Sequence, residues 1–395
     1  MLAKMESIYN ACTIKIITRK FCIIKMSMLL LVILFNFSYI SLSQIIIRGT
    51  VLSEATGLPV EGASIYFNNT SIGTSANASG NFFLPLPNIA NAELIVSAVG
   101  FQLLVFKPDA QNKNLVFKLA QKEGQMKDVL ILTDAVRKKY LALFEENFLG
   151  ITEEASMSSI KNRKDIYFTS GDSKRSFKAY ADTPLVIINK KLGYKISFEL
   201  SEFFFDETSG RTFYYGYTRF EDMGDKSRWI KNRKQCYYGS TMHFYRSLIA
   251  NDLKKQGYQI YLIKPVHLST DTSGGKKQQV NNRPSGTQGE MEMAVGVTAT
   301  QIINRDSSDI NNYIVTIPGK LMVQYGKEPA SKHYLKKSTF IQGYLAVGFR
   351  SYVSVKTSFI SLDNMGITNN PMDVEYGGYW IYEKAANMLP FNYMP

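Results

Sequence analysis

Cysteine and histidine are scarce in this chain of 395 residues, which contains three of each. Two cysteines fall in an N-terminal segment that we expect to be removed, so Cys236 alone remains and no intrachain disulfide can form. None of the histidines, His243, His267 and His333, stands in H-E-x-x-H or a similar ligand spacing. Esterase, phosphate-loop and dinucleotide motifs are absent as well. The sequence therefore predicts no metal, no cofactor and no catalytic residue.

Long hydrophobic runs are also few, and residues 26–40 form the only one with a targeting pattern. Basic residues from Lys15 to Lys25 precede this run, and Ser41-Leu42-Ser43 follows it, which is the order of a secretory signal peptide. We expect residues 1–43 to be the signal and cleavage to fall before Gln44. An uncleaved N-terminal anchor is the alternative. No later stretch is long and apolar enough for a transmembrane helix.

Acidic residues are outnumbered by basic ones, 33 to 46, for a formal net charge of +13. Removal of residues 1–43 takes away five cations and Glu6, which lowers the net charge to +9. Such a surplus favours an anionic partner such as a glycan or a lipid headgroup, and an ordinary soluble basic surface explains it equally well. For an exported chain we expect no nucleic-acid partner.

Tyrosine and phenylalanine are abundant, with 24 of each, and both favour pleated, half-buried strands. Short alternating segments in residues 44–120 are separated by turns at Gly57-Leu58-Pro59 and at residues 77–80. Such spacing predicts an antiparallel β-sandwich. The fold class expected for the whole chain is mainly β, with this sandwich followed by a larger β-rich α+β domain.

The sandwich segment carries a family resemblance. Its ordered motifs are T-G-L-P-V-E-G-A-S-I (56–65), S-G-N-F (79–82) and I-V-S-A-V-G-F (95–101). They resemble the carboxypeptidase regulatory-like domain, a transthyretin-like or Ig-like sandwich that is widespread in cell-envelope proteins of Bacteroidota. The turn N-A-S-G differs from the T-D-x-x-G that is frequent in this family. The resemblance implies an accessory module and an exported location in the periplasm, at the outer membrane or on the cell surface.

Residues 121–149 are predicted as a linker strand and a helix, and residues 150–395 as the β-rich C-terminal domain with a polar loop at 268–290. Within it we expect a hairpin of residues 199–206 and 212–219, a helix at 242–255 with Ser240 as its cap, and a short helix at 380–388. Several motifs, including the closing G-Y-W-I-Y-E-K-A-A-N-M-L-P-F-N-Y-M-P, resemble the C-terminal region of secreted Bacteroidota proteins that carry the same regulatory-like domain. That region has no assigned activity, so the resemblance transfers no catalytic residue.

A basic and aromatic cluster spans residues 226–243 and is the best candidate binding site. Arginine can give bidentate contacts to an anion, and aromatic rings can stack on it. The alternative is a solvated charged turn that leads into a helix. The candidate residues are Arg228, Trp229, Lys231, Arg233, Lys234, Tyr237, Tyr238 and His243.

Two classes of function follow. The favoured one is a non-catalytic binding or assembly protein of the cell envelope, whose partner is a glycan, an outer-membrane protein or another envelope chain. The alternative is a secreted hydrolase, which requires a pocket that joins His243 to a carboxylate and to Ser240 or Cys236. A run of aromatics at Phe203–Phe205 and Phe213–Tyr217 is read either as core or as a sugar- or peptide-binding face.

Overall fold

The computed structural model describes residues 45–89, 92–108, 114–122, 132–173, 175–266, 291–328 and 349–395, together with Lys25, Met26, Met28 and Tyr334. The chain divides into two units, Met1–Ile45 and Ile46–Pro395, and strands β1 to β21 belong to the second. The predicted cleavage site, the polar loop 268–290, His267 and His333 lie outside the described residues.

The N-terminal segment is a two-sheet sandwich, and the predicted mainly β fold class is confirmed. One sheet has the order β4-β1-β7 and the other the order β3-β2-β5-β6. One pairing differs from the expectation, because β1 and β7 run parallel, with Ser53 opposite Leu119. The strands are β1 (Ile46–Ser53), β2 (Ser64–Phe67), β3 (Gly73–Ser75), β4 (Asn81–Pro85), β5 (Leu94–Ser97), β6 (Leu104–Phe106) and β7 (Asn114–Leu119).

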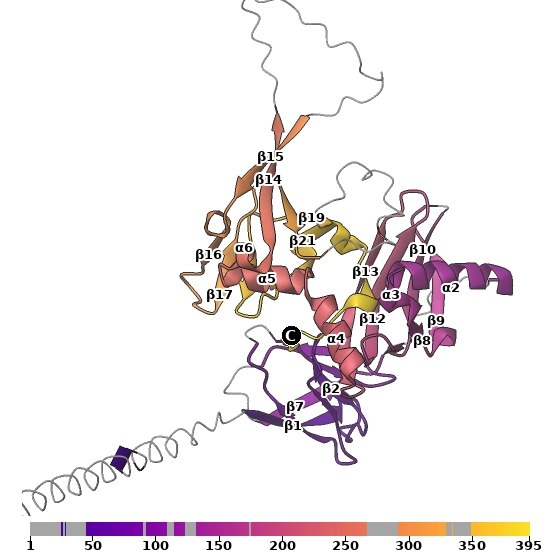
Figure 1. Ribbon diagram of the computed structural model, residues 1–395. Helices are drawn as coiled ribbons and strands as arrows, with labels where there is room; N and C mark the ends of the chain where they lie inside the picture. Colours follow the sequence, from indigo (N-terminus) through magenta and orange to yellow (C-terminus); the bar gives the residue numbers. More distant parts are fainter. Residues whose placement is uncertain are drawn as a thin grey trace, which may run out of the picture. The chain divides into compact units, whose positions relative to one another are not determined.

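A second antiparallel sheet follows, and helix α2 (Asp134–Phe148) packs on it (Figure 1). The long β12 pairs with β13 along one edge and with β11 and β10 along the other, so the predicted hairpin is confirmed. Phe144 and Phe148 of α2 are fully buried in its core, so this helix belongs to the sheet rather than to a free linker. The strands are β8 (Ser158–Ile160), β9 (Ile166–Ser170), β10 (Ser176–Ala181), β11 (Leu185–Asn189), β12 (Tyr194–Asp206) and β13 (Thr212–Asp222).

A third group of strands forms a separate hydrophobic core. Its main sheet has the order β15-β14-β18-β19-β21, and β16-β17-β20 form a smaller one. The core of the β8–β13 sheet and this separate core both lie mostly in residues 150–395, which the sequence assigns to a single domain. The domain boundaries at residues 120 and 149 stay predictions. The strands are β14 (Tyr258–Val266), β15 (Met291–Val297), β16 (Ile303–Arg305), β17 (Asn312–Val315), β18 (Lys320–Tyr325), β19 (Phe349–Val355), β20 (Ile360–Asp363) and β21 (Val374–Gly378).

The short helices differ from the expectations in three places. The charged turn before residue 240 is a helix, α4, and the helix expected at 242–255 is two helices, because Asn251 adopts a left-handed φ of 52°. The helix expected at 380–388 is two 3₁₀ turns. Helices and 3₁₀ turns are α3 (Glu153–Ser156), α4 (Ser227–Tyr237), α5 (Thr241–Ile249), α6 (Leu253–Gln256), Arg163–Asp165, Ala299–Gln301, Pro371–Asp373, Tyr379–Ile381 and Ala385–Asn387.

The sandwich is hydrogen-bonded to strand β13 of the β8–β13 sheet through the turn between β2 and β3. The Asn69 N–H donates to the Thr218 carbonyl oxygen at 2.7 Å, and the Phe220 N–H donates to the Thr70 carbonyl oxygen at 2.9 Å. The C-terminal segment joins the same turn, because the Phe391 N–H donates to the Asn69 carbonyl oxygen at 2.6 Å. We call this meeting point of turn 68–70, β13 and the C-terminal segment the seam.

Candidate functional site

Helix α4 carries most of the candidate binding residues and has one buried and one exposed face. Trp229, Arg233, Cys236 and Tyr237 are buried, at a spacing that places them on one side of a helix. Arg228, Lys231 and Lys234 are exposed on the other side. The helical stripe was concealed in the sequence because a charged residue, Arg233, occupies one of its inward positions.

Arg233 is 5% exposed and holds α4 against the turn between β11 and β12. Its guanidinium donates to the carbonyl oxygens of Leu192 and Gly193 at 2.7 and 2.9 Å, and to both carboxylate oxygens of Asp222 at 2.8 and 2.7 Å. Burial alone would raise the pKa of Asp222, but the hydrogen bonds from Arg233 and the Gly224 N–H hold that pKa below its ordinary value. Arg233 is therefore a structural residue rather than one that is available to a ligand.

Trp229 is also structural. Its indole N–H donates to the Lys190 carbonyl oxygen at 3.0 Å, and its ring covers Gly193. A Cβ at Gly193 would lie 2.2 Å from the indole, and its φ is 70°, so only glycine fits under this ring. The Lys226 ammonium lies 4.6 Å from the ring centroid. The indole is therefore buried with a cation over its ring and offers a ligand no open stacking surface.

The exposed face of α4 is the part of the predicted cluster that can reach a partner. Arg228, Lys231 and Lys234 are exposed, and Tyr238 beside them is half-buried. Arg228 and Lys234 lie 5.7 and 6.0 Å from the rings of Trp229 and Tyr238. Within the part of the chain that the structure describes, none of these three cations forms an ion pair with an acid. We call Arg228, Lys231 and Lys234 the α4 cations.

His243 is buried and has three hydrogen-bond partners around its ring. Its Nδ1 accepts from the Gly239 N–H at 3.1 Å and from the Tyr258 hydroxyl at 3.0 Å, which leaves the proton on Nε2, 3.3 Å from Gln256 Oε1. Burial lowers the pKa of His243 to about 4, so the ring is neutral at pH 7. These contacts fix the start of α5 against β14, which is a structural role.

The groups required for the hydrolase alternative are not brought together. Ser240 Oγ donates to the Tyr237 carbonyl oxygen and accepts the His243 backbone N–H, so it caps α5 as predicted and has no bond to the imidazole. The Cys236 thiol donates to the Asn387 carbonyl oxygen at 3.0 Å, and burial raises its pKa well above the ordinary value. Among the described residues, the imidazole has no carboxylate, Ser240 or Cys236 partner.

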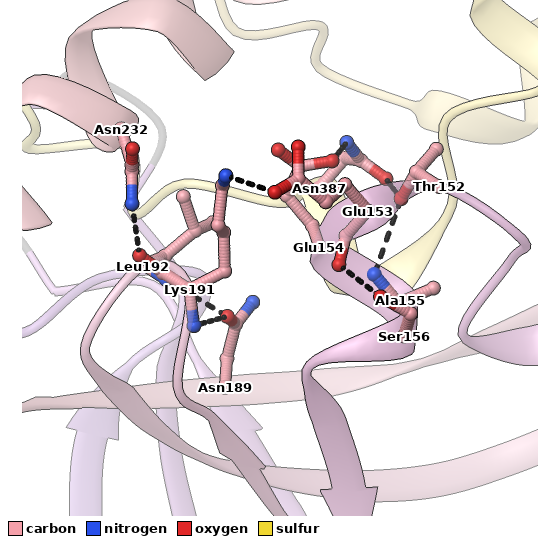
Figure 2. Close-up of polar contacts among 10 residues, drawn as sticks. All are labelled: Thr152, Glu153, Glu154, Ala155, Ser156, Asn189, Lys191, Leu192, Asn232 and Asn387. Carbon is pink, nitrogen blue, oxygen red and sulfur yellow. Dashed lines mark hydrogen bonds and ion pairs between the residues drawn. The ribbon is translucent and has the colours of Figure 1, made fainter. Parts of the chain in front are cut away.

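A polar network ties α4 to the C-terminal segment (Figure 2). Thr152 caps α3 and donates to Asn387, and Asn387 donates to Glu154 at 3.1 Å. Lys191 pairs with Glu153 at 2.6 Å, and its carbonyl oxygen accepts from Asn232 of α4 at 2.8 Å. Glu153 and Glu154 thus help to hold these segments together.

Two cavities of about 280 Å³ each share a wall formed by Ile367, Thr368 and Pro371 and by Met388 and Phe391 of the C-terminal segment. The first, which we call the Glu383 cavity, is lined by Cys236, Ser240 and Glu383 among mainly apolar groups. Burial, and then the carboxylates of Glu154 and Glu328, raise the pKa of Glu383 to about 8. Pattern reasoning missed Glu383, whose only sequence signal is a lone carboxylate within W-I-Y-E-K.

The second, the seam cavity, is lined by the turn 68–70, by residues 214–216 and Thr218 of β13, and by residues 367–372. Tyr214 and Tyr215, from the aromatic run noted in the sequence, belong to its wall, whereas Phe203 and Phe205 are buried in the core. The core reading therefore holds for Phe203 and Phe205, and the binding-face reading stays a prediction. No cluster of three or more potential metal ligands occurs in the described ranges.

Residues 47–131 match the family model of the CarboxypepD_reg-like domain. The N-terminal sandwich is therefore a carboxypeptidase regulatory-like domain, as its motifs implied. The presence of a CarboxypepD_reg-like domain is compatible with an envelope protein. No curated protein matches the chain. None of the helices that the structure describes has both the length and the apolar character needed to cross a membrane.

Two solved structures show limited similarity to this chain. One is a protein of unknown function from Bacteroides fragilis NCTC 9343, described as membrane-associated, with 12% identity over 40% of this chain and 64% of that chain and a TM-score of 0.16. The other is a 9R-lipoxygenase from Cyanothece PCC8801, with 9% identity over 52% of this chain and 48% of that chain and a TM-score of 0.16. TM-scores this low carry no inference about fold or function.

Proposed function

We propose that this protein is an exported cell-envelope protein with a non-catalytic binding role, and that the α4 cations bind an anionic partner. The observation that carries this proposal is the exposure of Arg228, Lys231 and Lys234 on one face of a helix that contains no acidic residue. The buried face fixes that helix rigidly through Arg233 and Trp229. Because the helix backbone is already fixed, binding of phosphate or carboxylate groups costs only the ordering of the three cationic side chains.

The export signal predicted in residues 1–43 and the carboxypeptidase regulatory-like domain support the envelope location. Fractionation of the native host tests this part. We expect the protein in the periplasmic, membrane or surface fraction, with a mature chain that begins near Gln44. Recovery of the chain in the cytosol with residues 1–43 intact would contradict it.

Charge reversal tests the binding role. The triple variant Arg228→Glu, Lys231→Glu, Lys234→Glu is compared with the unchanged protein for binding to phosphatidylglycerol vesicles and, in a separate arm, to heparin. Each cation near an anionic surface contributes about 1 kcal/mol, so we expect a loss of roughly two orders of magnitude in affinity in one arm or both. Salt should weaken the binding of the unchanged protein through screening.

The matched control reverses three exposed lysines elsewhere, Lys138, Lys161 and Lys164, for the same change in net charge. We expect it to retain most of the binding. An equal loss in both triple variants would show that net charge alone attracts the ligand and would remove α4 as the site. Arg233 is left unchanged in this test because its removal would disturb the fold.

A further inference from the structure

The Glu383 cavity contains a carboxyl group that the described residues leave unpaired. Glu383 lines this cavity, and neither of its carboxyl oxygens has a hydrogen-bond or ion-pair partner in the described part of the chain. The residue keeps partial exposure, and its oxygens are not among the fully enclosed atoms without partners, so a molecule in the cavity can reach them. An unpaired carboxyl among mainly apolar groups is costly, which indicates a ligand that completes it.

The charges around Glu383 favour a cation over an anion. After burial, the carboxylates of Glu154 and Glu328 raise its pKa, and no cation among the described residues lowers it. The Cys236 thiol on the same wall is affected alike, because burial and then Glu383 and Glu154 raise its pKa. Lys384 also lines the cavity, but its ammonium donates to a backbone carbonyl oxygen of α2 at 2.9 Å. A ligand that neutralises Glu383 must therefore bring its own positive charge.

Three aromatic side chains, Tyr245, Tyr376 and Trp380, form one wall of the cavity. The Tyr376 hydroxyl donates to the Tyr245 hydroxyl at 3.2 Å, and the Trp380 indole N–H donates to the Gly239 carbonyl oxygen at 2.8 Å. Burial raises the pKa of both tyrosines, to about 12 for Tyr376, so both are uncharged at pH 7. With these polar hydrogens engaged, the wall offers ring surface, which attracts apolar groups and cations.

The size of the cavity limits the ligand to a small molecule. Its volume of about 280 Å³ lies just below the roughly 300–1,000 Å³ of sites for drug-sized ligands. Met242 and Pro371 on its lining are partly or fully exposed, which places the cavity at the surface. An aliphatic amine is protonated at pH 7, like a lysine side chain, and joins a cation to an apolar body. We propose that the Glu383 cavity binds a small organic amine, with its ammonium group on the Glu383 carboxylate and its apolar body against the three aromatic rings.

Binding of such an amine should displace a proton from Glu383. The carboxyl is mostly protonated at pH 7, because its pKa is about 8. An ammonium group beside it favours the carboxylate, so the acid proton passes to solvent as the ion pair forms. At pH 7 binding should therefore release up to about 0.9 proton for each amine bound.

Isothermal titration calorimetry on the full mature chain, at pH 7 in PIPES and in Tris buffer, measures affinity and proton release together. Phenethylamine is the probe, and phenethyl alcohol and hydrocinnamate are its neutral and anionic counterparts of similar shape. Glu383→Gln removes the charge with little change in shape. Glu375→Gln is the matched control, because Glu375 is an exposed carboxylate of β21 that does not line the cavity.

We expect phenethylamine to bind with proton release, phenethyl alcohol to bind at least about tenfold more weakly, and hydrocinnamate not to bind. Glu383→Gln should weaken phenethylamine binding at least about tenfold and abolish the proton release, and Glu375→Gln should change neither. No binding of phenethylamine, equal binding of the alcohol, or binding to the unchanged protein without proton release would overturn the proposal. The proton release is measured on the unchanged protein, so this result does not depend on the folding of a variant. The cavity selects the opposite charge from the α4 cations, so failure of either proposal leaves the other standing.

Discussion

The contact between helix α4 and the β11–β12 turn, formed by Arg233, and the seam around Thr218 both contain buried polar groups. These groups differ in whether the protein supplies their hydrogen-bond partners. Arg233 donates four hydrogen bonds, two to carbonyl oxygens and two to Asp222. At the seam, Thr218 Oγ1 and Asn69 Oδ1 have no partner among the described groups. A fully partnered buried group is what a structural role requires, whereas an unpartnered one is a cost that folding alone does not explain.

The largest expected effect comes from breaking the contact between Arg233 and the β11–β12 turn. Arg233→Ala removes four hydrogen bonds and leaves the Leu192 and Gly193 carbonyl oxygens without the guanidinium donor, so we expect the free energy of unfolding to fall by about 3 kcal/mol. Urea denaturation measures it. The adjacent exposed residue supplies the control, since Lys234→Ala should change stability by less than about 0.5 kcal/mol. Similar losses in the two variants would mean that the buried face of α4 does not anchor the helix.

Glu383 extends the comparison to an ionisable group whose pKa is lowered by no cation among the described residues. Its pKa of about 8 in the folded state exceeds the ordinary value of 4.5, so between these pH values the folded state keeps a proton that the unfolded state releases. Stability should therefore fall as pH rises through this window, by at most about 1.4 kcal/mol per pH unit, and the fall should end above pH 8.

Urea denaturation of the unchanged protein and of Glu383→Gln, at several pH values from 4.5 to 9, measures this effect as the difference between the two. The glutamine variant cannot titrate, so its advantage should grow with pH. A constant difference across the range would show that the Glu383 carboxyl is well solvated and that the apolar wall of its cavity does not control its charge.

The smallest expected effect separates the two kinds of buried hydroxyl. Thr218→Val removes an unpartnered hydroxyl, so stability should stay unchanged or rise by up to about 1 kcal/mol. Thr70, across the seam, is also buried, but its hydroxyl donates to the Phe67 carbonyl oxygen at 2.8 Å and accepts from the Ile72 N–H at 3.0 Å. Thr70→Val should therefore cost about 1–3 kcal/mol. Equal costs would show that Thr218 is partnered after all.

Much of the fold follows from local patterns in the sequence. Alternating apolar residues and Gly, Pro and Asn turns predict the sandwich, and the long β12–β13 hairpin follows from the same logic. The apolar spacing of Phe144 and Phe148 predicts α2. These elements are local, so the residues that specify each one are neighbours in the chain.

The seam and the arrangement around α4 could not be predicted in this way. Arg233 reads as a surface charge unless Asp222 and the 192–193 carbonyls are known to face it, and that contact depends on tertiary packing. Thr218 meets Asn69 across 149 positions in the sequence, and no periodicity links the two. Local signals existed only for the left-handed residues, since asparagine tolerates that conformation better than most residues, as at 69 and 251.

The parallel pairing of β1 with β7 has a mechanical consequence. The chain enters this pair at Ile46 and leaves it at Leu119, and because the strands run in the same direction these two points lie at opposite ends of the ladder. A force that pulls the entry and exit points apart acts along the strands and loads all of their hydrogen bonds in shear at once. An antiparallel pair pulled from adjacent ends would instead open one bond at a time. The sandwich can thus bear tension between whatever holds its N-terminus and the rest of the chain.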